Sequence, residues 1–398
     1  MKRLLLLAAL LPVMLLSSSA QDFTNFRIPE HIASPEFVGD TVVLRFAGEY
    51  VSDVKVDGSW LAAPAPMQKR EGVWELRLAA LPGDFYVYRF IVDGVPSLDP
   101  SNPLVQHHGE DLRNFFVVDG PRSKAYSKAT RHGDVSFVWY DSKIMGTNRR
   151  MAVYTPYGYS HEKRRTYPVL YLMHGEGGDE ESWLNMGHVA EILDNLIQQG
   201  RAVPMIVVMP NCTPTQQAAP TLGLPEVVNS RTTSSSVFMS SLINEIIPFV
   251  QSRYRTIPRK AGRAVCGIGV NGTTVINAAV MYPDLFDFVL PLSCGVEDNG
   301  HLVEDFLRIK KARVKLFWTG VGTRDTVAYE PSQRLHETLS YIHLDHTFFV
   351  MTGGRDWNLW RHDLTNFAPM IFKYYTDSLY SLGYLTVKQA PSRAKDLE

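Results

Sequence analysis

The chain has 398 residues, which is enough for two domains with separate hydrophobic cores. Its formal net charge is −1 at pH 7 and no basic cluster is visible, so the composition gives no electrostatic basis for nucleic acid or another polyanion as a partner. The three cysteines, Cys212, Cys266 and Cys294, do not indicate a disulfide scaffold, and we expect them to be buried free thiols.

The N-terminus has the pattern of a signal peptide. Met1-Lys2-Arg3 precedes an apolar run over residues 4–16, and small residues follow up to Ala20. The apolar run is shorter than the roughly 20 residues that a membrane span needs. We therefore expect residues 1–20 to be removed and the protein to be exported, to the periplasm or the medium of a bacterium, with no membrane span.

Residues 21–120 are rich in short β-type runs. Turn signals separate these runs at Asp57-Gly58, at Pro82-Gly83-Asp84 and at Asp93-Gly94. Regular β-runs with such punctuation predict an antiparallel, immunoglobulin-like β-sandwich. Trp74 and Tyr88 are expected in its core. The predicted strands cover residues 41–46, 51–56, 72–78 and 85–92.

The pattern changes after a polar stretch, 121–135, that is predicted to be a linker. Apolar strand-like runs then alternate with helical segments, which predicts a mostly parallel sheet wrapped by helices over residues 136–376. Pro248 is expected to bend the helix predicted over 240–254. Residues 377–398 are expected to be a peripheral tail. The strand-like runs cover residues 169–173, 205–209, 263–266, 288–292, 314–318 and 347–351.

One strand-turn-helix segment has the context of the nucleophile elbow of an α/β-hydrolase, Gly-x-Ser-x-Gly. Cys266-Gly267-Ile268-Gly269-Val270-Asn271-Gly272 lies between an apolar run and a helix-like stretch over 273–281. Gly269 occupies the serine position, and Asn271 occupies the second glycine position. Because glycine has no nucleophile, the sequence predicts that no acyl-enzyme forms at this turn.

The second domain resembles the bacterial feruloyl and acetyl-xylan esterases, which are esterase D-like α/β-hydrolases. The first domain is similar to the immunoglobulin-like, glycogen-binding-type (early-set) module that precedes the esterase in many members, through Trp74, Tyr86-Val87-Tyr88-Arg89-Phe90 and Asp99-Pro100-Ser101-Asn102-Pro103. The resemblance covers nearly the whole chain after residue 20. In the second domain it rests on His174-Gly175-Glu176-Gly177-Gly178-Asp179-Glu180, Ser182-Trp183, Pro204-Met205-Ile206-Val207-Val208-Met209-Pro210 and Tyr282-Pro283-Asp284-Leu285-Phe286.

The resemblance implies a Ser, Asp and His triad at three positions of this chain. The serine falls on Gly269, the acid on Asp325, and the histidine on Arg355 within Gly353-Gly354-Arg355-Asp356-Trp357. Arginine cannot act as a general base because its pKa stays above about 12. We therefore expect no catalytic residues at these degenerate positions, and an ion pair between Arg355 and Asp325 instead.

The resemblance also implies a surrounding pocket. Gly175 and Glu176 fall in the loop that supplies oxyanion-binding N–H groups in the family, and Val270 follows the nucleophile position. The aromatic candidates for ligand binding are Trp183, Trp357 and Trp360 at the pocket mouth and Trp60 in the first domain, each with core packing as the alternative. We expect no cofactor and no metal, since neither His343-Leu344-Asp345-His346 nor His107-His108 has a third ligand at a recognisable spacing.

Three functions follow from the sequence, in order of preference. The first is an exported, catalytically inactive esterase homologue that binds plant polysaccharide or oligosaccharide, namely xylan or its feruloyl and acetyl decorations. The second is an active carbohydrate esterase with an unusual catalytic set. The third is a protein-interaction scaffold that associates with secreted glycoside hydrolases.

Overall fold

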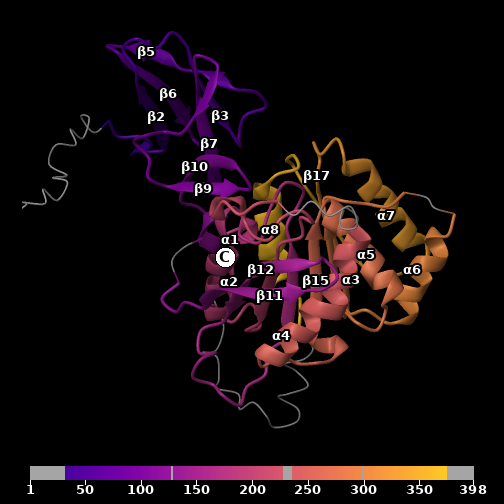
Figure 1. Ribbon diagram of the computed structural model, residues 1–398. Coiled ribbons are helices and arrows are strands. Elements are labelled where there is room, and N and C mark those ends of the chain that lie inside the picture. The colour runs from indigo at the N-terminus through magenta and orange to yellow at the C-terminus, as the bar shows by residue number, and fades with distance from the viewer. Residues whose placement is uncertain (1–31, 127–128, 227–234, 298–299, 374–398) are drawn as a thin grey trace, which may run out of the picture.

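The computed structural model describes residues 32–126, 129–226, 235–297 and 300–373 (Figure 1). The predicted signal peptide and the predicted tail lie outside these residues. Within them, two antiparallel sheets precede a larger mixed sheet that is covered by helices. The fold class expected from the sequence, an α/β-hydrolase preceded by an all-β sandwich, is confirmed.

The first domain is built from two facing sheets. One sheet has the strand order β1-β2-β6-β5, and the other has the order β4-β3-β7-β10-β9 with β8 paired to β7. Val42, Trp74, Tyr88, Phe90 and Phe116 are among the side chains that meet between the sheets. The strands are β1 (Glu36–Val38), β2 (Thr41–Ala47), β3 (Val54–Gly58), β4 (Ala65–Pro66), β5 (Gln68–Arg70), β6 (Val73–Ala79), β7 (Phe85–Val92), β8 (Val95–Ser97), β9 (Val105–His108) and β10 (Asp111–Val117).

The second domain contains an eight-stranded sheet with the order β11-β12-β14-β13-β15-β16-β17-β18. β11, β12 and β14 pair antiparallel, and the pairs from β14 and β13 through to β18 are parallel. The predicted mostly parallel sheet is therefore present. The strands are β11 (Asp134–Ser142), β12 (Thr147–Thr155), β13 (Val169–Met173), β14 (Ile206–Pro210), β15 (Arg263–Ile268), β16 (Phe288–Leu292), β17 (Leu316–Gly322) and β18 (Thr347–Met351).

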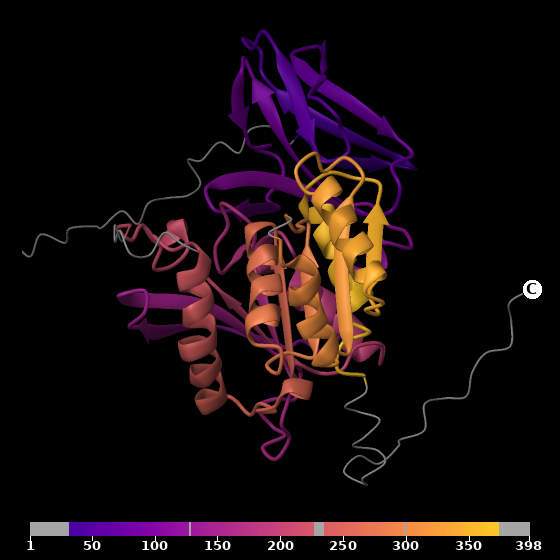
Figure 2. The ribbon, with the colours of Figure 1, turned by 90° about the vertical axis from the view of Figure 1, so that its right-hand side faces the viewer.

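Helices pack on both faces of this sheet and create two hydrophobic cores (Figure 2). One core is formed with α3 to α7, and the other with α1, α2 and α8. The helices are α1 (Ser182–Asn185), α2 (Val189–Gln198), α3 (Ser235–Ser241), η4 (Leu242–Ile246), α4 (Ile247–Arg253), α5 (Val270–Met281), α6 (Leu302–Lys311), α7 (Tyr329–Tyr341) and α8 (Trp357–Phe367), with short 3-10 turns η2 (Ser123–Tyr126), η3 (Pro220–Leu222) and η5 (Lys260–Gly262).

The helix around Pro248 differs from the prediction in two respects. It begins earlier, at Ser235, and contains a π-turn, η4, immediately before α4. Pro248 has no N–H to donate to a carbonyl one turn earlier, and a π-turn accommodates that missing bond. The proline therefore changes the local winding instead of ending the helix.

Strand β7 joins the two domains because both of its faces are buried. Tyr86 and Tyr88 face the sandwich core, whereas the alternate side chains Phe85 and Val87 belong to the core shared with α1, α2 and α8. The Arg361 guanidinium lies over the Phe85 ring, 4.2 Å from its centroid. The sandwich is thus packed into the hydrolase domain rather than tethered to it, and η2 within the predicted linker packs against α2.

A buried acid at this domain boundary makes stability depend on pH. The Asp84 Oδ2 accepts from His362 Nε2 at 3.0 Å. Burial alone would raise the pKa of Asp84, but the hydrogen bond and charge of His362 lower it on balance. A depressed folded-state pKa contributes stability above the unfolded pKa of about 3.9, and that stability is lost as pH falls through the folded pKa.

We therefore expect Asp84→Asn to lower the free energy of unfolding at pH 6 and to flatten its decline between about pH 5 and pH 3. Urea unfolding at a series of pH values measures both effects. A variant with the same acid slope as the unaltered protein would contradict the role given to Asp84.

Candidate functional site

The elbow predicted from the sequence is present between β15 and α5. Gly269 has φ +58° and ψ −119°, a conformation that residues with a side chain rarely adopt. A Cβ at Gly267 would overlap the backbone of Asn271, so glycine is required there for the close approach of strand and helix. The turn therefore has the sharp strand-to-helix geometry of a nucleophile elbow, without a side chain at its apex.

Asn271 ties the elbow to the loop that follows β13. It lies in the first turn of α5, and its Nδ2 donates to the His174 carbonyl at 2.7 Å. His174 is itself fixed, because its Nε2 accepts from the Cys212 N–H at 2.8 Å. Since a backbone N–H can only donate, the proton of the neutral ring sits on Nδ1, which donates to the Gly175 carbonyl at 2.7 Å.

Arg355 occupies the space above the elbow. A Cβ added at Gly269 would overlap the Nη2 of Arg355. The Arg355 Nη1 donates to the Ser293 carbonyl at 2.7 Å and lies 3.6 Å from the Asp325 Oδ2. The ion pair expected from the sequence is therefore present, and the guanidinium fills the volume into which a residue 269 side chain would project.

Asp325 is fully buried and held by the backbone. Its Oδ1 accepts from the N–H groups of Val327 and Ala328 at 3.1 and 2.9 Å. Its Oδ2 has no hydrogen-bond partner among the described residues apart from the longer approach of Arg355. The three positions that the resemblance assigned to a triad, Gly269, Asp325 and Arg355, thus converge in space.

Two pockets meet at Arg355 and Glu176. The first, of about 510 Å³, runs along α5 and is closed by α6 and by the segment after β16; it will be called the helix pocket. The second, of about 500 Å³, lies between the domains and will be called the junction pocket. The junction pocket is lined by Ser59, Val87, Asp111 and Arg113 from the sandwich and by Gly175, Glu176, Met186, Ile268, Arg355, Asp356, Trp357, Asn358, Trp360 and Arg361 from the hydrolase domain.

The four tryptophan candidates divide into two groups. Trp357 and Trp360 line the junction pocket, although most of each ring is buried. Trp183 fills the core, where its indole N–H donates to the Met173 carbonyl at 3.1 Å, and it lines neither pocket. Trp60 packs edge-on against Tyr86 at the margin of the sandwich core, is partly exposed, and lines neither pocket.

The sequence reasoning missed the residues that the sandwich contributes. Asp111 and Arg113 reach the junction pocket because β10 lies beside β7 in the docked sheet, and no local pattern reveals how two domains dock. It also missed Arg150, which donates to Glu180 at 2.5 Å and anchors the acidic loop beside the site. The sequence signal for such a cation was the adjacent acidic pair Asp179-Glu180, because a buried carboxylate requires a cationic partner.

Three further expectations concern the chemistry available. Cys212, Cys266 and Cys294 are free and buried, as predicted, and burial raises the pKa of the Cys294 thiol to about 12. Among the described residues no group of three or more His, Cys, Asp or Glu side chains could hold a metal ion. In the same part of the chain no helix is long and apolar enough to cross a membrane.

Comparison with known proteins identifies a matching family model and several relatives. The family model described as "Putative esterase" matches residues 142–371. The chain is 29% identical over 313 residues to an endo-1,4-beta-xylanase/feruloyl esterase of Xylanibacter ruminicola, which covers 76% of the chain and 40% of that relative. It is 25% identical over 258 residues to endo-1,4-beta-xylanase Y of Acetivibrio thermocellus, covering 58% of the chain and 22% of that relative. The chain thus spans less than half the length of each.

Solved structures show the same fold at lower sequence identity. A ferulic acid esterase of Anaeromyces mucronatus superposes with a TM-score of 0.53 at 24% identity, covering 63% of the chain and 96% of that structure. The enterobactin esterase of Shigella flexneri superposes with a TM-score of 0.64 at 18% identity, covering 85% of the chain and 96% of that structure. The coverage of the second structure extends the likeness into the β-domain.

Proposed function

The chain belongs to the esterase family, and we propose that it is an exported member whose ester-cleaving site has become a binding site for plant cell-wall polysaccharide. One observation carries the proposal. Gly269 lies at the position on which the resemblance places the family's serine, and the Arg355 guanidinium occupies the space that a side chain there would need. The ligands proposed are xylan or its feruloyl and acetyl decorations, and secreted glycoside hydrolases are proposed partners.

The chemistry of ester cleavage lacks two components at this site. A serine esterase needs a hydroxyl and an imidazole that accepts its proton. Gly269 has no hydroxyl, and an arginine side chain has N–H donors but no acceptor for a proton. Loss of the serine or the histidine from a comparable triad costs about 10⁶ in turnover. Residual cleavage at that level is too slow to be the function.

An alternative nucleophile finds little support in the geometry. Ser293 lines the helix pocket, but its hydroxyl is fully buried and accepts the Trp360 indole N–H at 2.9 Å. Among the described residues that line either pocket there is no histidine. An active esterase with an unusual catalytic set would therefore have to work without a histidine base.

The junction pocket has the character of a carbohydrate site. Trp357 and Trp360 supply apolar edges, and Arg113 and Asp356 supply charged hydrogen-bonding groups. The Oδ1 of Asn358, which also lines the pocket, is buried without a hydrogen-bond partner among the described residues, and a ligand hydroxyl would satisfy it. The xylanase and feruloyl esterase names of the relatives favour xylan as the ligand.

A second candidate function is supported by the outer edge of the large sheet. Phe137 and Trp139 lie on β11, the edge strand, and are 47% and 44% exposed. An exposed aromatic edge strand favours association with another protein. This observation keeps the interaction scaffold as the alternative.

Affinity electrophoresis tests the proposed function. The protein should be retarded in a gel that contains arabinoxylan or acetylated glucuronoxylan and should run normally in gels that contain β-glucan or starch. Asn358→Ala should reduce the retardation, because it removes the unpartnered amide from the pocket. Asn366→Ala, on the exposed far turn of the same helix, is the matched control and should leave it unchanged. Normal migration in every gel would contradict polysaccharide binding and favour the scaffold.

A further inference from the structure

We infer that Arg355 binds the carboxylate of a monocarboxylic acid with an apolar body, so that the helix pocket takes the free acid in preference to its ester. The inference rests on the proposed loss of hydrolysis, because a site that cleaved esters would need the space that the guanidinium occupies. It goes further than that loss, since it assigns a ligand chemistry to the residue that replaced the family's histidine.

The donors of Arg355 are only partly used. Nη1 donates to the Ser293 carbonyl and approaches Asp325. Nε and Nη2 have no acceptor among the described residues, and Nη2 lies directly over Gly269. The side chain is 28% exposed and lines both pockets. A guanidinium with free donors in a partly desolvated cavity is suited to bind a carboxylate through two parallel hydrogen bonds.

An added anion at Arg355 would meet two carboxylates, that of Asp325 and that of Glu176, which lines both pockets with Arg355. The nearby Asp325 carboxylate is stabilised by two backbone N–H groups, which disperse its charge. Helix α5, twelve residues long, begins at Val270, so its positive dipole end and its first N–H groups point to the same region. These donors and the guanidinium together favour a negative group beside Arg355, near the N-terminal end of α5.

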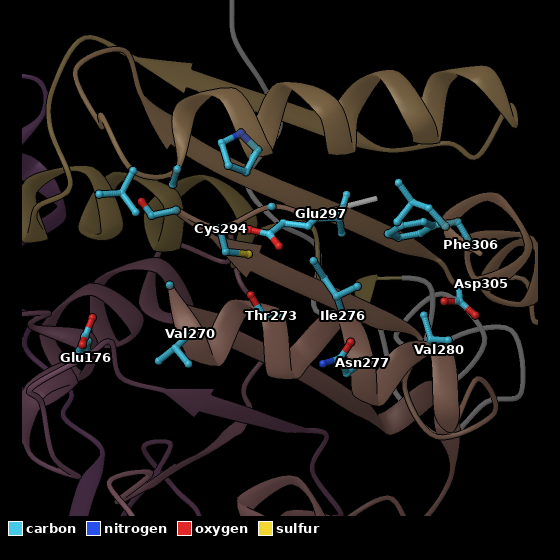
Figure 3. A pocket seen from close by; sticks show the side chains of 18 of the residues that line it. Glu176, Val270, Thr273, Ile276, Asn277, Val280, Cys294, Glu297, Asp305 and Phe306 are labelled. Carbon is cyan, nitrogen blue, oxygen red and sulfur yellow. The ribbon is translucent and has the colours of Figure 1, made fainter. Parts of the chain in front are cut away.

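The rest of the helix pocket determines the body of the ligand. Figure 3 shows Val270, Ile276 and Val280 along α5, with Phe306 at the end far from Glu176. These apolar side chains favour an apolar body over a sugar ring with hydroxyls on all sides. A pocket of about 510 Å³ has room for an aryl or alkenyl acid. The remaining lining residues that carry charge are acidic: Glu176, Glu297 and Asp305.

Those acidic residues add a selectivity rule. Asp305 lies beside Phe306 at the end of the helix pocket far from Glu176, where a second carboxylate on the ligand would meet like charge (Figure 3). Among the described residues that line the helix pocket, Arg355 is the one cation. The pocket is therefore expected to bind a monoacid and to reject a diacid of the same shape.

The test compares trans-cinnamate with methyl cinnamate by isothermal titration calorimetry on the full chain. Cinnamate should bind at least about tenfold more tightly than its ester, because a charge-assisted bidentate contact is roughly twice as strong as a neutral one. Arg355→Gln should weaken cinnamate binding about tenfold to a hundredfold and leave the ester unaffected. Arg324→Gln, at an exposed arginine beside Asp325, is the matched control and should change neither affinity.

Further variants and ligands test whether the charge, the fork of the guanidinium or the folding of the protein determines the affinity. Arg355→Lys keeps the charge without the fork and should show intermediate affinity, and thermal unfolding checks that each variant is folded. Neither 4-carboxycinnamate nor glucuronate should bind as tightly as cinnamate. Any of three results would overturn the inference. These are equal affinity for cinnamate and its ester, tighter binding of the diacid or the sugar acid than of cinnamate, and no binding of cinnamate. Proton NMR of the methyl cinnamate sample detects ester cleavage separately. Cleavage would contradict the proposed function and not only this inference.

Discussion

Replacing Gly269 by Ser and Arg355 by His in the same chain should raise hydrolysis of an aryl acetate at least about 10³-fold over the unaltered protein. The elbow already has the required backbone angles, and Asp325 is already buried and held by two backbone N–H groups. Under the proposed function, the two substitutions restore the hydroxyl and the imidazole of a triad. The rate should rise with pH around the ordinary histidine pKa of about 6.5, as general-base catalysis requires.

The single variants are the controls for this experiment. Gly269→Ser alone should remain inactive, because the new side chain meets the Arg355 guanidinium and no base is present. Arg355→His alone should remain inactive because it has no nucleophile. A serine at φ +58° stores strain of about 1–3 kcal/mol, so a modest loss of thermal stability is expected in the double variant. If the hydrolysis rate of the double variant were only the sum of the gains in the two single variants, the new serine and histidine would not be acting together as a triad.

Trp357→Ala should cost about 3–5 kcal/mol in the free energy of unfolding, the largest stability effect expected near the site. Trp357 stands between two other tryptophans, with its ring centroid 5.1 Å from that of Trp183 and 5.0 Å from that of Trp360, both in edge-to-face contact. Removing the central ring leaves a cavity in the core that α8 shares with the sheet. Urea unfolding monitored by fluorescence and circular dichroism measures the loss.

The matched control is Trp139→Ala, whose ring is 44% exposed on β11 and whose removal should change stability by less than about 0.5 kcal/mol. Trp357→Phe should recover much of the lost stability because it refills the cavity. If Trp357→Ala cost no more than Trp139→Ala, the edge-to-face contacts of the three tryptophans would not stabilise the site. A loss of glycan binding in Trp357→Ala could therefore come from lost folding or from lost contact with the glycan. Asn358→Ala is the better probe of binding.

The fold could be predicted where the apolar pattern was unambiguous. Buried parallel strands such as 169–173 and 288–292 appear as continuous apolar runs and were placed correctly. The hairpin of β11 and β12 was not identified, because apolar residues fall on both faces of β11. Val138 and Tyr140 are buried there, whereas Phe137 and Trp139 face outward, which hides the alternation that marks a half-buried strand.

The candidate site could be predicted in part. The positions of Gly269, Asp325 and Arg355 followed from motifs, and their convergence is set by the parallel sheet, whose strand ends meet at one edge. Asp111 and Arg113 could not be predicted, because their place in the junction pocket depends on the docking of β7 into the second domain. Trp183 could not be assigned by sequence alone, since a tryptophan beside a pocket and one beneath it have the same local pattern.

We expect the unaltered protein to bind its ligand at this site without cleaving esters there. The most direct test is to incubate it with stoichiometric p-nitrophenyl acetate and with methyl ferulate, and to follow product release and protein mass together. The account predicts no burst of nitrophenol, no acyl adduct on the protein, and ester recovered intact at the background rate. A stoichiometric burst with an acyl adduct on a peptide from the pocket, abolished by one substitution there, would contradict it.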